Sequence, residues 1–359
     1  MRPRSENKIK AIGLMSGTSL DGLDLVAAEF WQNNGKWNFN IVAAETENYA
    51  IDWTEQLKTA STLSGQQLIK LHVEYGRYLG QKTKAFIQKT RFTPELIASH
   101  GHTIFHQPEN GFTFQLGSGF EIAGIAGITT VADFRSGDVA LGGQGAPLVP
   151  AGDKLLFSNF EYCLNLGGFA NISFEENNYR KAFDICPVNI VFNYFASKNG
   201  HLFDCNGNLG RIGNIDFLLL EKLNSLDFYK KEPPKSLGRE WVESKFLPVL
   251  EKFECPESDK IRTVYEHVAQ QISKIIRNNE KLLITGGGAW NTFLIELIEA
   301  KSNIKITIPP GKIVNFKEAL VFAFLGTLRV QNTINCFSSV TGAKNDHSAG
   351  VIFQAKTSN

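Results

Sequence analysis

This sequence has neither an excess of one sign of charge nor a long apolar run. Its 37 lysines and arginines face 36 aspartates and glutamates, so the formal net charge is +1 at pH 7. Such a balance gives no field for capturing nucleic acid or an anionic membrane surface. The richest apolar stretch, residues 319–328, is much shorter than the roughly 18 to 20 residues of a membrane span. We therefore expect a small-molecule substrate, with neither nucleic acid nor membrane as a partner.

Cysteine pairs are missing as well. The five cysteines are scattered and form no CxxC pair, and residues 1–10 are polar and charged. A secretory signal peptide would need an apolar core there. Scattered thiols are typical of proteins in a reducing compartment. The sequence thus predicts reduced cysteines and a cytoplasmic location.

Three widespread catalytic signatures are absent from the chain. No GxxxxGK[ST] segment occurs, which argues against a P-loop fold. Residues 117–119 (GSG) lack the third glycine of the dinucleotide fingerprint, because Ile122 stands at that position. The GxSxG segment of a serine hydrolase is also missing.

Three histidines gather in one loop. His100, His102 and His106 are spaced two and four residues apart, and a zinc cluster is conceivable there. Histidines beside a loop glycine more often hydrogen-bond within the protein or contact a ligand. We favour that second interpretation.

The segment GLMSGTSLDGLD, residues 13–24, carries the strongest chemical signal. Strands are predicted on both sides of it, at 8–15 and 23–31, and Gly17 and Gly22 permit a tight turn with close approach of a ligand. Clustered amides and hydroxyls suit phosphate oxygens. Asp21 and Asp24 would repel a bare anion, so they imply a bridging Mg²⁺, held directly or through water. The alternative is a hairpin with surface acids.

The N-terminal third of the chain has clear local signals. A strand at 37–46 should complete a meander, with Asn34-Gly35 as a hairpin turn. A long helix is predicted from Ser64, where Gln67 completes a capping box. The remaining expectations are strands at 96–99, 112–116 and 128–132, a helix at 121–126 and a glycine-rich loop at 136–150.

The pattern of strand, glycine turn and strand recurs later in the chain. A strand at 162–166, the turn Gly167-Gly168 and a strand at 169–174 repeat the N-terminal pattern, and a strand at 282–284 enters Thr285–Gly288 before a helix from about 291. A length of 359 residues also favours two lobes. Duplicated α/β halves with a nucleotide between them are the plan of the actin-like and sugar-kinase superfamily. We place the first lobe at 1–130 plus about 340–359 and the second at 131–339.

Asp184 is the best candidate for a general base. It follows an apolar pair and precedes Pro187, as expected at the end of a strand. A partly desolvated aspartate has a raised pKa and accepts a proton near neutrality. The alternative is a helix N-cap, with Pro187 in the first helical turn.

Two further residues could orient a substrate. Arg135 offers a guanidinium fork for an anionic or acylamino group, although a surface salt bridge with Asp133 or Asp138 is equally compatible with the local sequence. Glu318 lies near the start of an apolar helix predicted at 316–328, where it is either a favourable first-turn charge or a hydrogen-bond acceptor for substrate.

Seven ordered segments resemble the anhydro-N-acetylmuramic acid kinases and span nearly the whole chain. They are GLMSGTSLDGLD (13–24), SHGHTIFHQP (99–108), ADFRSGDVALGGQGAPLVP (132–150), NLGGFANISF (165–174), PPKSLGRE (233–240), TGGGAWN (285–291) and VTGA (340–343). The first and third are highly specific to this family. The resemblance implies a two-lobed, actin-like kinase of the α/β class with duplicated ribonuclease H-like domains. It also implies an active-site cleft between the lobes, with ATP and Mg²⁺ as cofactors.

The resemblance further implies a reaction in peptidoglycan recycling. A water assisted by a carboxylate base opens 1,6-anhydro-N-acetylmuramate, and the freed oxygen takes the γ-phosphate of ATP, giving N-acetylmuramate 6-phosphate and ADP. Carried onto this sequence, the base is Asp184. A homodimer is expected only by analogy. The implied nucleotide-binding residues are Gly17, Thr18, Ser19, Leu20, Asp21, Gly22, Asp24, Gly167, Gly168, Thr285, Gly286, Gly287 and Gly288, and the implied sugar-binding residues are His100, Arg135, Asn189 and Glu318.

The chain departs from the family pattern beside the base. Residues 183–189 are FDICPVN where FDTGPGN is common, so Ile185, Cys186 and Val188 replace a threonine and two glycines. That change removes a hydroxyl and backbone space next to Asp184. His102 stands where glutamine is usual.

Two alternatives to this kinase follow. One is a related actin-fold kinase of another amino sugar. The other is a weakly active or non-catalytic ATP-binding sensor, against which Asp21, Asp24 and Asp184 speak, because a sensor needs no base. The absence of a helix-turn-helix or basic segment argues against a repressor.

Overall fold

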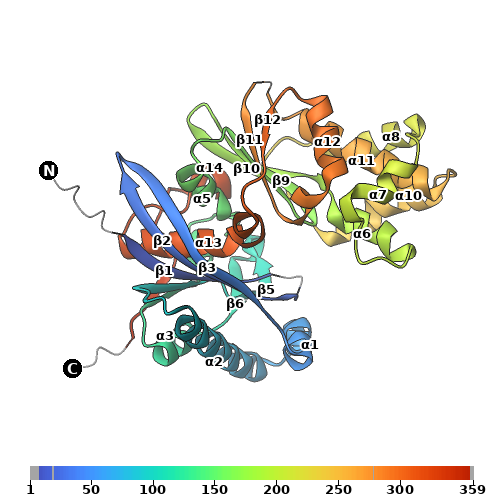
Figure 1. Ribbon diagram of the computed structural model, residues 1–359. Coiled ribbons are helices and arrows are strands. Elements are labelled where there is room, and N and C mark those ends of the chain that lie inside the picture. Colours follow the sequence, from blue (N-terminus) through green and yellow to red (C-terminus); the bar gives the residue numbers. More distant parts are fainter. Residues whose placement is uncertain (1–7, 18–19, 278, 356–359) are drawn as a thin grey trace. The chain divides into compact units, whose positions relative to one another are not determined.

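The computed structural model describes residues 8–17, 20–277 and 279–355. The chain forms two compact units (Figure 1). The first comprises Met1–Leu156 with Phe316–Asn359, and the second comprises Phe157–Asn315. No helix in the described ranges has both the length and the apolar character needed to cross a bilayer. The five cysteines are free, as expected.

The first unit is built on a six-stranded mixed sheet in the order β13-β7-β4-β1-β2-β3. β1, β2 and β3 form the predicted antiparallel meander, whereas β4 is parallel to β1 and β7 is parallel to β4. A separate hairpin pairs β5 with β6. The strands are β1 (Ile9–Ser16), β2 (Gly22–Asn33), β3 (Lys36–Asn48), β4 (Leu96–Ser99), β5 (His102–Gln107), β6 (Phe112–Leu116), β7 (Thr130–Ala132) and β13 (Val351–Phe353).

The hairpin turn and the helix start predicted from short sequence motifs are both present in this unit. Asn34 and Gly35 have φ values of 50° and 76°, which makes them the left-handed pair of a tight hairpin turn. Ser64 and Gln67 form both bonds of the capping box in front of α2. The helices are α1 (Ile51–Thr59), α2 (Gly65–Thr90), α3 (Gly119–Ala126), α4 (Ser136–Ala140), α5 (Val149–Leu156), α13 (Gly311–Val330) and α14 (Ser338–Thr341).

Both faces of β1 and β2 are largely buried. Tyr75 and Leu79 of α2 share a core cluster with Ile12 and Leu14 of β1. The opposite face packs against α13, where the rings of Phe30 and Phe324 lie 5.3 Å apart. Successive side chains of a strand point to opposite faces, so burial on both sides explains the nearly continuous apolar character of β1 and β2.

Gly13 lets α13 approach β1 closely, and Gly13→Ala should destabilise the first unit. An added Cβ would lie 1.9 Å from the backbone oxygen of Ala319, which cannot move aside as a side chain could. Overpacking of this kind costs about 1–3 kcal/mol of unfolding free energy, measured by urea denaturation. Gly65→Ala is the matched control, because its Cβ would meet open space. Equal stability of the two variants would contradict this packing.

The second unit repeats the plan of the first. Its five-stranded sheet has the order β10-β9-β8-β11-β12, with β8, β9 and β10 antiparallel and β11 and β12 added in parallel. The strands are β8 (Tyr162–Leu166), β9 (Phe169–Glu176), β10 (Tyr179–Pro187), β11 (Lys281–Thr285) and β12 (Lys305–Thr307). The helices are α6 (Asn189–Lys198), α7 (Asn208–Ile212), α8 (Phe217–Asn224), α9 (Arg239–Trp241), α10 (Leu247–Lys252), α11 (Glu257–Ser273) and α12 (Thr292–Lys301).

The two sheets therefore share one topology. Written from the meander outward, the first reads β3-β2-β1-β4-β7 and the second reads β10-β9-β8-β11-β12, with the same strand directions. This repetition confirms the duplicated α/β architecture predicted from the repeated glycine turns.

The unit boundaries differ from those expected at 130/131 and 339/340. The first unit takes in residues 131–156 and 316–339. A buried ion pair of 2.6 Å between Lys317 and Asp153 ties α13 to α5, and α5 in turn contacts β3. The backbone of Phe316 (φ −120°, ψ 17°) interrupts α13 where the chain re-enters this unit. These long-range contacts leave no composition shift for a sequence-based boundary.

Candidate functional site

The turn after β1 is anchored by a hydrogen-bonded network. Tyr49 donates its hydroxyl to Ser16 Oγ at 2.7 Å, and Ser16 Oγ lies 2.9 Å from His102 Nδ1. Tyr75 extends the network through a 2.6 Å contact with the Tyr49 hydroxyl. Burial lowers the pKa of His102 to about 4, which favours the neutral imidazole in its hydrogen bond with Ser16. His102, the departure from the usual glutamine, therefore supports the turn.

The predicted phosphate turn is only partly visible. Thr18 and Ser19 lie outside the described residues. The Leu20 amide donates to the Gly17 carbonyl at 3.4 Å, which closes the turn, and the Leu20 side chain packs against the core. A Cβ at Gly22 would lie 2.6 Å from the Glu47 carbonyl, so this glycine serves strand pairing rather than ligand approach.

Two carboxylates follow that turn. Asp21 is exposed, and Asp24 is partly buried at the start of β2. Thr46 donates its hydroxyl to Asp24 Oδ1 at 2.6 Å, which fixes the carboxylate. Burial raises the pKa of Asp24 above its usual value, the Thr46 bond opposes that shift and the charge of Asp21 adds to it. A bound cation would relieve the repulsion between these two carboxylates. Their oxygens are also the kind of ligand that Mg²⁺ prefers.

Arg135 and His100 form a second polar centre in the first unit. Arg135 donates from Nε at 3.0 Å and Nη2 at 2.8 Å to His100 Nε2, and from Nη1 to the Gly145 carbonyl at 2.6 Å. Nε2 must be unprotonated, so Nδ1 carries the proton and donates to the Gly101 carbonyl at 2.9 Å. Burial first, and then Arg135, hold the pKa of His100 well below its usual range. Arg135 thus bonds to His100 and Gly145 in the described part of the chain, rather than forming the alternative surface salt bridge with Asp133 or Asp138.

A cavity of about 280 Å³ opens beside His100. Asp133 lies at its rim, and its Oδ1 accepts from the Ser136 amide at 3.2 Å. Polar groups from several elements meet apolar rings there, as in most small-molecule sites. The lining residues include His72, Ser99, His100, Gly101, Gln115, Asp133 and Ser136, with Phe114, Phe120 and Phe353 as the aromatic part.

Glu318 is a charged neighbour of Arg135. It is exposed in α13, two residues after the interruption at Phe316. Burial lowers the pKa of Arg135 to about 10, and the carboxylate of Glu318 opposes that shift more than any other charge does. Glu318 is thus an electrostatic neighbour of Arg135, which in turn contacts His100.

Asp184 lies near the end of β10 in the second unit, not at a helix N-cap. Its Oδ2 accepts from the Leu237 amide at 2.8 Å, and its own amide donates to the Lys235 carbonyl at 3.0 Å. Burial raises the pKa of Asp184, and the bond from Leu237 opposes that shift. Helix α6 begins after Val188, so the N-cap alternative is wrong.

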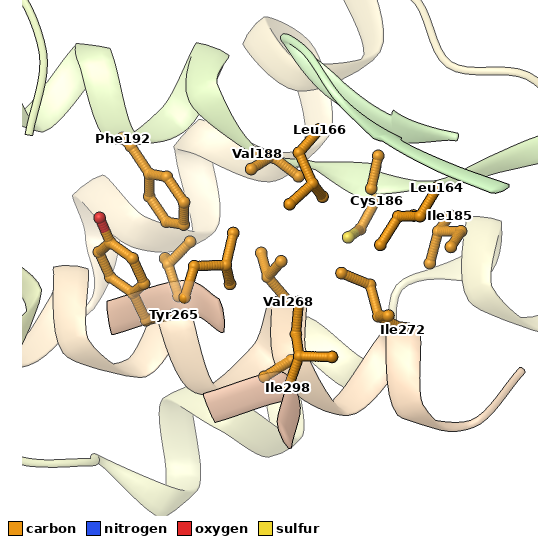
Figure 2. Packing of buried hydrophobic residues seen from close by; sticks show 14 of the residues in the cluster. Leu164, Leu166, Ile185, Cys186, Val188, Phe192, Tyr265, Val268, Ile272 and Ile298 are labelled. Atoms are coloured by element: carbon orange, nitrogen blue, oxygen red, sulfur yellow. The ribbon is translucent and has the colours of Figure 1, made fainter. Parts of the chain in front are cut away.

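The departures beside the base face the core. The register of β10 shifts between Asp184 and Cys186, which leaves Ile185 as the extra residue of a bulge. Ile185, Cys186 and Val188 are almost fully buried, and Figure 2 shows their side chains among Leu164 and other core residues. The replacements therefore change the packing of the second unit rather than the polar groups around Asp184.

Asn189 is hydrogen-bonded to the turn formed by Gly167 and Gly168. Its amide donates to the Gly167 carbonyl at 3.3 Å, and its Nδ2 donates to the Leu166 carbonyl at 3.2 Å. The Gly168 carbonyl accepts from the Val188 amide at 2.8 Å. Asn189 is thus part of the glycine-turn framework, in a different unit from the other three sugar-site candidates.

In the turn after β11, Gly287 is exposed and uncrowded, whereas its neighbours are buried or crowded. Thr285 is fully buried, and its Oγ1 has no hydrogen-bond partner among the described residues. Gly286 has φ 83°, and a Cβ there would lie 2.6 Å from Asn165 Oδ1. Gly288 is also crowded, whereas Gly287 is exposed and a Cβ there would come no nearer than 3.9 Å to any group.

Sequence reasoning missed several supporting residues. Tyr49 and Tyr75 are far from the phosphate turn in sequence, and an aromatic residue near a helix is usually core. Leu237 contributes only a backbone amide, which no side-chain pattern reveals. Gln115, which lies next to the incomplete GSG fingerprint, was a detectable signal, because a glutamine at the end of an apolar strand is unusual.

Comparison with known proteins places the chain in a family. The profile described as anhydro-N-acetylmuramic acid kinase matches residues 9–355. The protein of that name from Mannheimia succiniciproducens is 35% identical over 369 residues, which cover 95% of this chain and 98% of the relative. The one from Photobacterium profundum is 34% identical, with coverage of 96% and 98%.

Solved structures are more distant. The activator of the 2-hydroxyisocaproyl-CoA dehydratase from Clostridium difficile has a TM-score of 0.43 and 13% identity, covering 90% of this chain and 97% of that one. A ROK family glucokinase from Streptomyces griseus has a TM-score of 0.40 and 9% identity, with coverage of 88% and 98%. The profile and the curated relatives settle the assignment: the chain belongs to the anhydro-N-acetylmuramic acid kinase family.

Proposed function

We propose that this chain opens 1,6-anhydro-N-acetylmuramic acid with water and phosphorylates it at the 6-position, with Asp184 as the base. The family is one of ATP-using kinases. The observation that carries the proposal is the carboxylate of Asp184, which the Leu237 amide fixes and burial makes more basic. The altered residues beside it, Ile185, Cys186 and Val188, belong to the buried hydrophobic core of the second unit.

The proposed reaction conserves atoms and charge. Asp184 takes a proton from a water as the water oxygen bonds to the anomeric carbon. The bond between that carbon and the bridging oxygen breaks, and the oxygen stays on the 6-carbon. It then bonds to the γ-phosphorus of ATP as the bond from that phosphorus to the ADP oxygen breaks, ADP leaves, and Asp184 releases its proton to solvent. Because the transferred group needs little covalent help, positioning and charge neutralisation supply most of the catalysis.

The first unit would hold the sugar. The cavity beside His100 combines aromatic faces for a sugar ring with polar groups for its N-acetyl and lactyl substituents. Arg135 supplies the positive charge for the lactyl carboxylate, and its bonds to His100 and Gly145 hold its guanidinium plane fixed. Glu318 would accept from a sugar hydroxyl. Asn189, by contrast, supports the glycine turns of the second unit.

ATP and Mg²⁺ would be held by the glycine turns and the acid pair. The residues after β1 from Gly17 to Asp24 offer amides and hydroxyls for phosphate, and Asp21 and Asp24 would hold Mg²⁺. The repulsion between these two carboxylates fits a divalent cation. Mg²⁺ would neutralise charge on the phosphates. Gly167 and Gly168 would face phosphate as well, and the turn from Thr285 to Gly288 would line the nucleoside.

The expected setting follows from this chemistry. The anhydro sugar is a product of peptidoglycan turnover, and ATP is a cytoplasmic co-substrate, so we place the reaction in the cytoplasm. A homodimer is part of the proposal by analogy with the family alone.

Oxygen labelling tests the proposal. The purified protein is incubated with ATP, Mg²⁺ and the anhydro sugar in water enriched in 18O, and the product is examined by fragment mass spectrometry. Label at the anomeric hydroxyl, with none in the phosphate bridge, is expected. A phosphorylated sugar that carries no label would contradict coupled hydrolysis and would favour a kinase of another amino sugar.

Gly287→Val should weaken ATP binding without loss of stability. The position is exposed, and a Cβ there has no neighbour nearer than 3.9 Å, so the new side chain would project into the space assigned to the nucleoside. We expect the KM for ATP to rise by about 10-fold, an effect of about 1.4 kcal/mol. Melting temperature should not change. An unchanged KM would place the nucleoside elsewhere.

Gly286→Ala is the contrasting variant. Its φ of 83° and the 2.6 Å approach to Asn165 Oδ1 predict a loss of stability. A raised KM for ATP in Gly287→Val and a lowered stability in Gly286→Ala would show that the first residue lines a binding surface and that the second holds a strained turn.

A further inference from the structure

A group of metal-ligating side chains lies in the first unit, and none of its members is assigned to ATP or sugar. Asp138 in α4 is fully buried, Cys336 is almost fully buried, and the side chain of His347 is 14% exposed. Asp138 Oδ1 lies 3.2 Å from Cys336 Sγ and 3.6 Å from His347 Nε2. In the described ranges these three residues make up the one group with the spacing of a metal site.

The backbone fixes two of the three positions. Cys336 and His347 face each other in an isolated antiparallel bridge, with both amide-to-carbonyl distances at 3.1 Å. Asp138 is held by the Gly145 amide on Oδ2 at 2.6 Å and by the Thr341 hydroxyl on Oδ1 at 2.7 Å. The site is therefore preorganised by three separate segments of the chain.

One buried nitrogen of His347 faces the carboxylate of Asp138. The other ring nitrogen, Nδ1, lies 3.2 Å from the Asn345 carbonyl, which can only accept a hydrogen bond. Nε2 lies 3.6 Å from Asp138 Oδ1, and this buried atom has no hydrogen-bond partner among the described residues. A cation between Nε2 and the carboxylate would give both groups a partner. An Nδ1–H bond to a backbone carbonyl is also the usual support of a metal-bound histidine.

We propose that Asp138, Cys336 and His347 bind a zinc ion. The ligands would be Asp138 Oδ1, Cys336 Sγ and His347 Nε2. Bonds of about 2.0 to 2.3 Å in tetrahedral directions set ligand atoms about 3.3 to 3.5 Å apart, close to the observed separations. The combination of thiolate, imidazole and carboxylate favours zinc over Mg²⁺ or Ca²⁺. Binding replaces the S–H bond of Cys336 with an S–Zn bond, and the proton passes to solvent.

Zinc titration of the full-length chain tests the site. The protein is stripped with a chelator, dialysed and titrated calorimetrically with zinc chloride, and bound metal is counted by elemental mass spectrometry. One zinc per chain is expected. Cys336→Ser and His347→Gln should each weaken binding by at least about 100-fold. Cys205→Ser and His201→Gln are the matched controls, because both residues are exposed in the second unit, and they should retain full affinity.

Cobalt supplies a readout that does not require a folded variant. The unmodified chain loaded with Co²⁺ should show thiolate-to-metal charge-transfer absorption, which Cys205→Ser keeps. No zinc retained by the unmodified chain would overturn the site, as would equal affinity in the ligand variants and the controls. ATP-dependent phosphorylation is measured separately, so failure here does not bear on the proposed kinase reaction.

Discussion

Asp184→Asn is expected to lower kcat by about two to four orders of magnitude while ATP binding stays close to normal. A positioned general base contributes about that factor, and asparagine cannot accept the proton. The amide oxygen can still accept from the Leu237 amide, which Asp184 does at 2.8 Å, so the local structure should persist. Steady-state kinetics with the anhydro sugar, together with calorimetric ATP titration, measure both quantities.

Asp227→Asn is the control for that variant. Asp227 is an aspartate of the same unit whose side chain is 93% exposed and pairs with nearby Lys230. Its removal should leave kcat unchanged. Near-normal turnover in Asp184→Asn would remove the base from the proposed mechanism.

The pH dependence of kcat/KM offers an independent check on the same residue. Burial raises the pKa of Asp184 above the usual value for aspartate. The base acts in its ionised form, so activity should fall as the pH decreases through this raised pKa, and it should be fully present above it. The residual activity of Asp184→Asn should lack this acidic limb.

Arg135→Lys is expected to raise the KM for the sugar by about 10- to 100-fold. The guanidinium donates two bonds to His100 and one to the Gly145 carbonyl, a fork that an ammonium group cannot reproduce. The charge remains but its direction is lost, and bonds to charged groups contribute about 1.5–3 kcal/mol each. Initial rates over a range of sugar concentrations at saturating ATP measure the change.

Arg77→Lys provides the comparison. Arg77 is an exposed arginine of α2 that pairs with Glu121 on the surface, so its replacement should alter neither KM nor stability. If Arg135→Lys lowered only the melting temperature and left the KM for the sugar unchanged, Arg135 would be a structural residue and the sugar would bind elsewhere.

Features encoded by short segments could be predicted from the sequence. Asn34-Gly35 specifies its hairpin because both residues tolerate positive φ, and Ser64 with Gln67 specifies the start of α2. The placement of Asp184 on a strand also follows from its neighbours. Each of these depends on groups within a few residues of one another.

Features set by distant contacts could not be predicted. The amide that holds Asp184 belongs to Leu237, 53 residues further along the chain. Helices α4 and α5 begin or lie within the glycine-rich stretch expected to be a loop, because their residues pack against elements far away in sequence. The inward direction of Ile185 depends on a bulge, which shifts the alternation of β10 and leaves no trace in composition.

The bulge at Ile185 also bears on how related sequences are recognised. Substitutions on its inward side, at Cys186 and Val188, alter how the interior of the second unit fits together and leave the carboxylate of Asp184 in place. A search pattern that demands threonine and glycines around this aspartate would therefore discard sequences that keep the reactive group. A pattern built on the aspartate, the following proline and the asparagine would retain them.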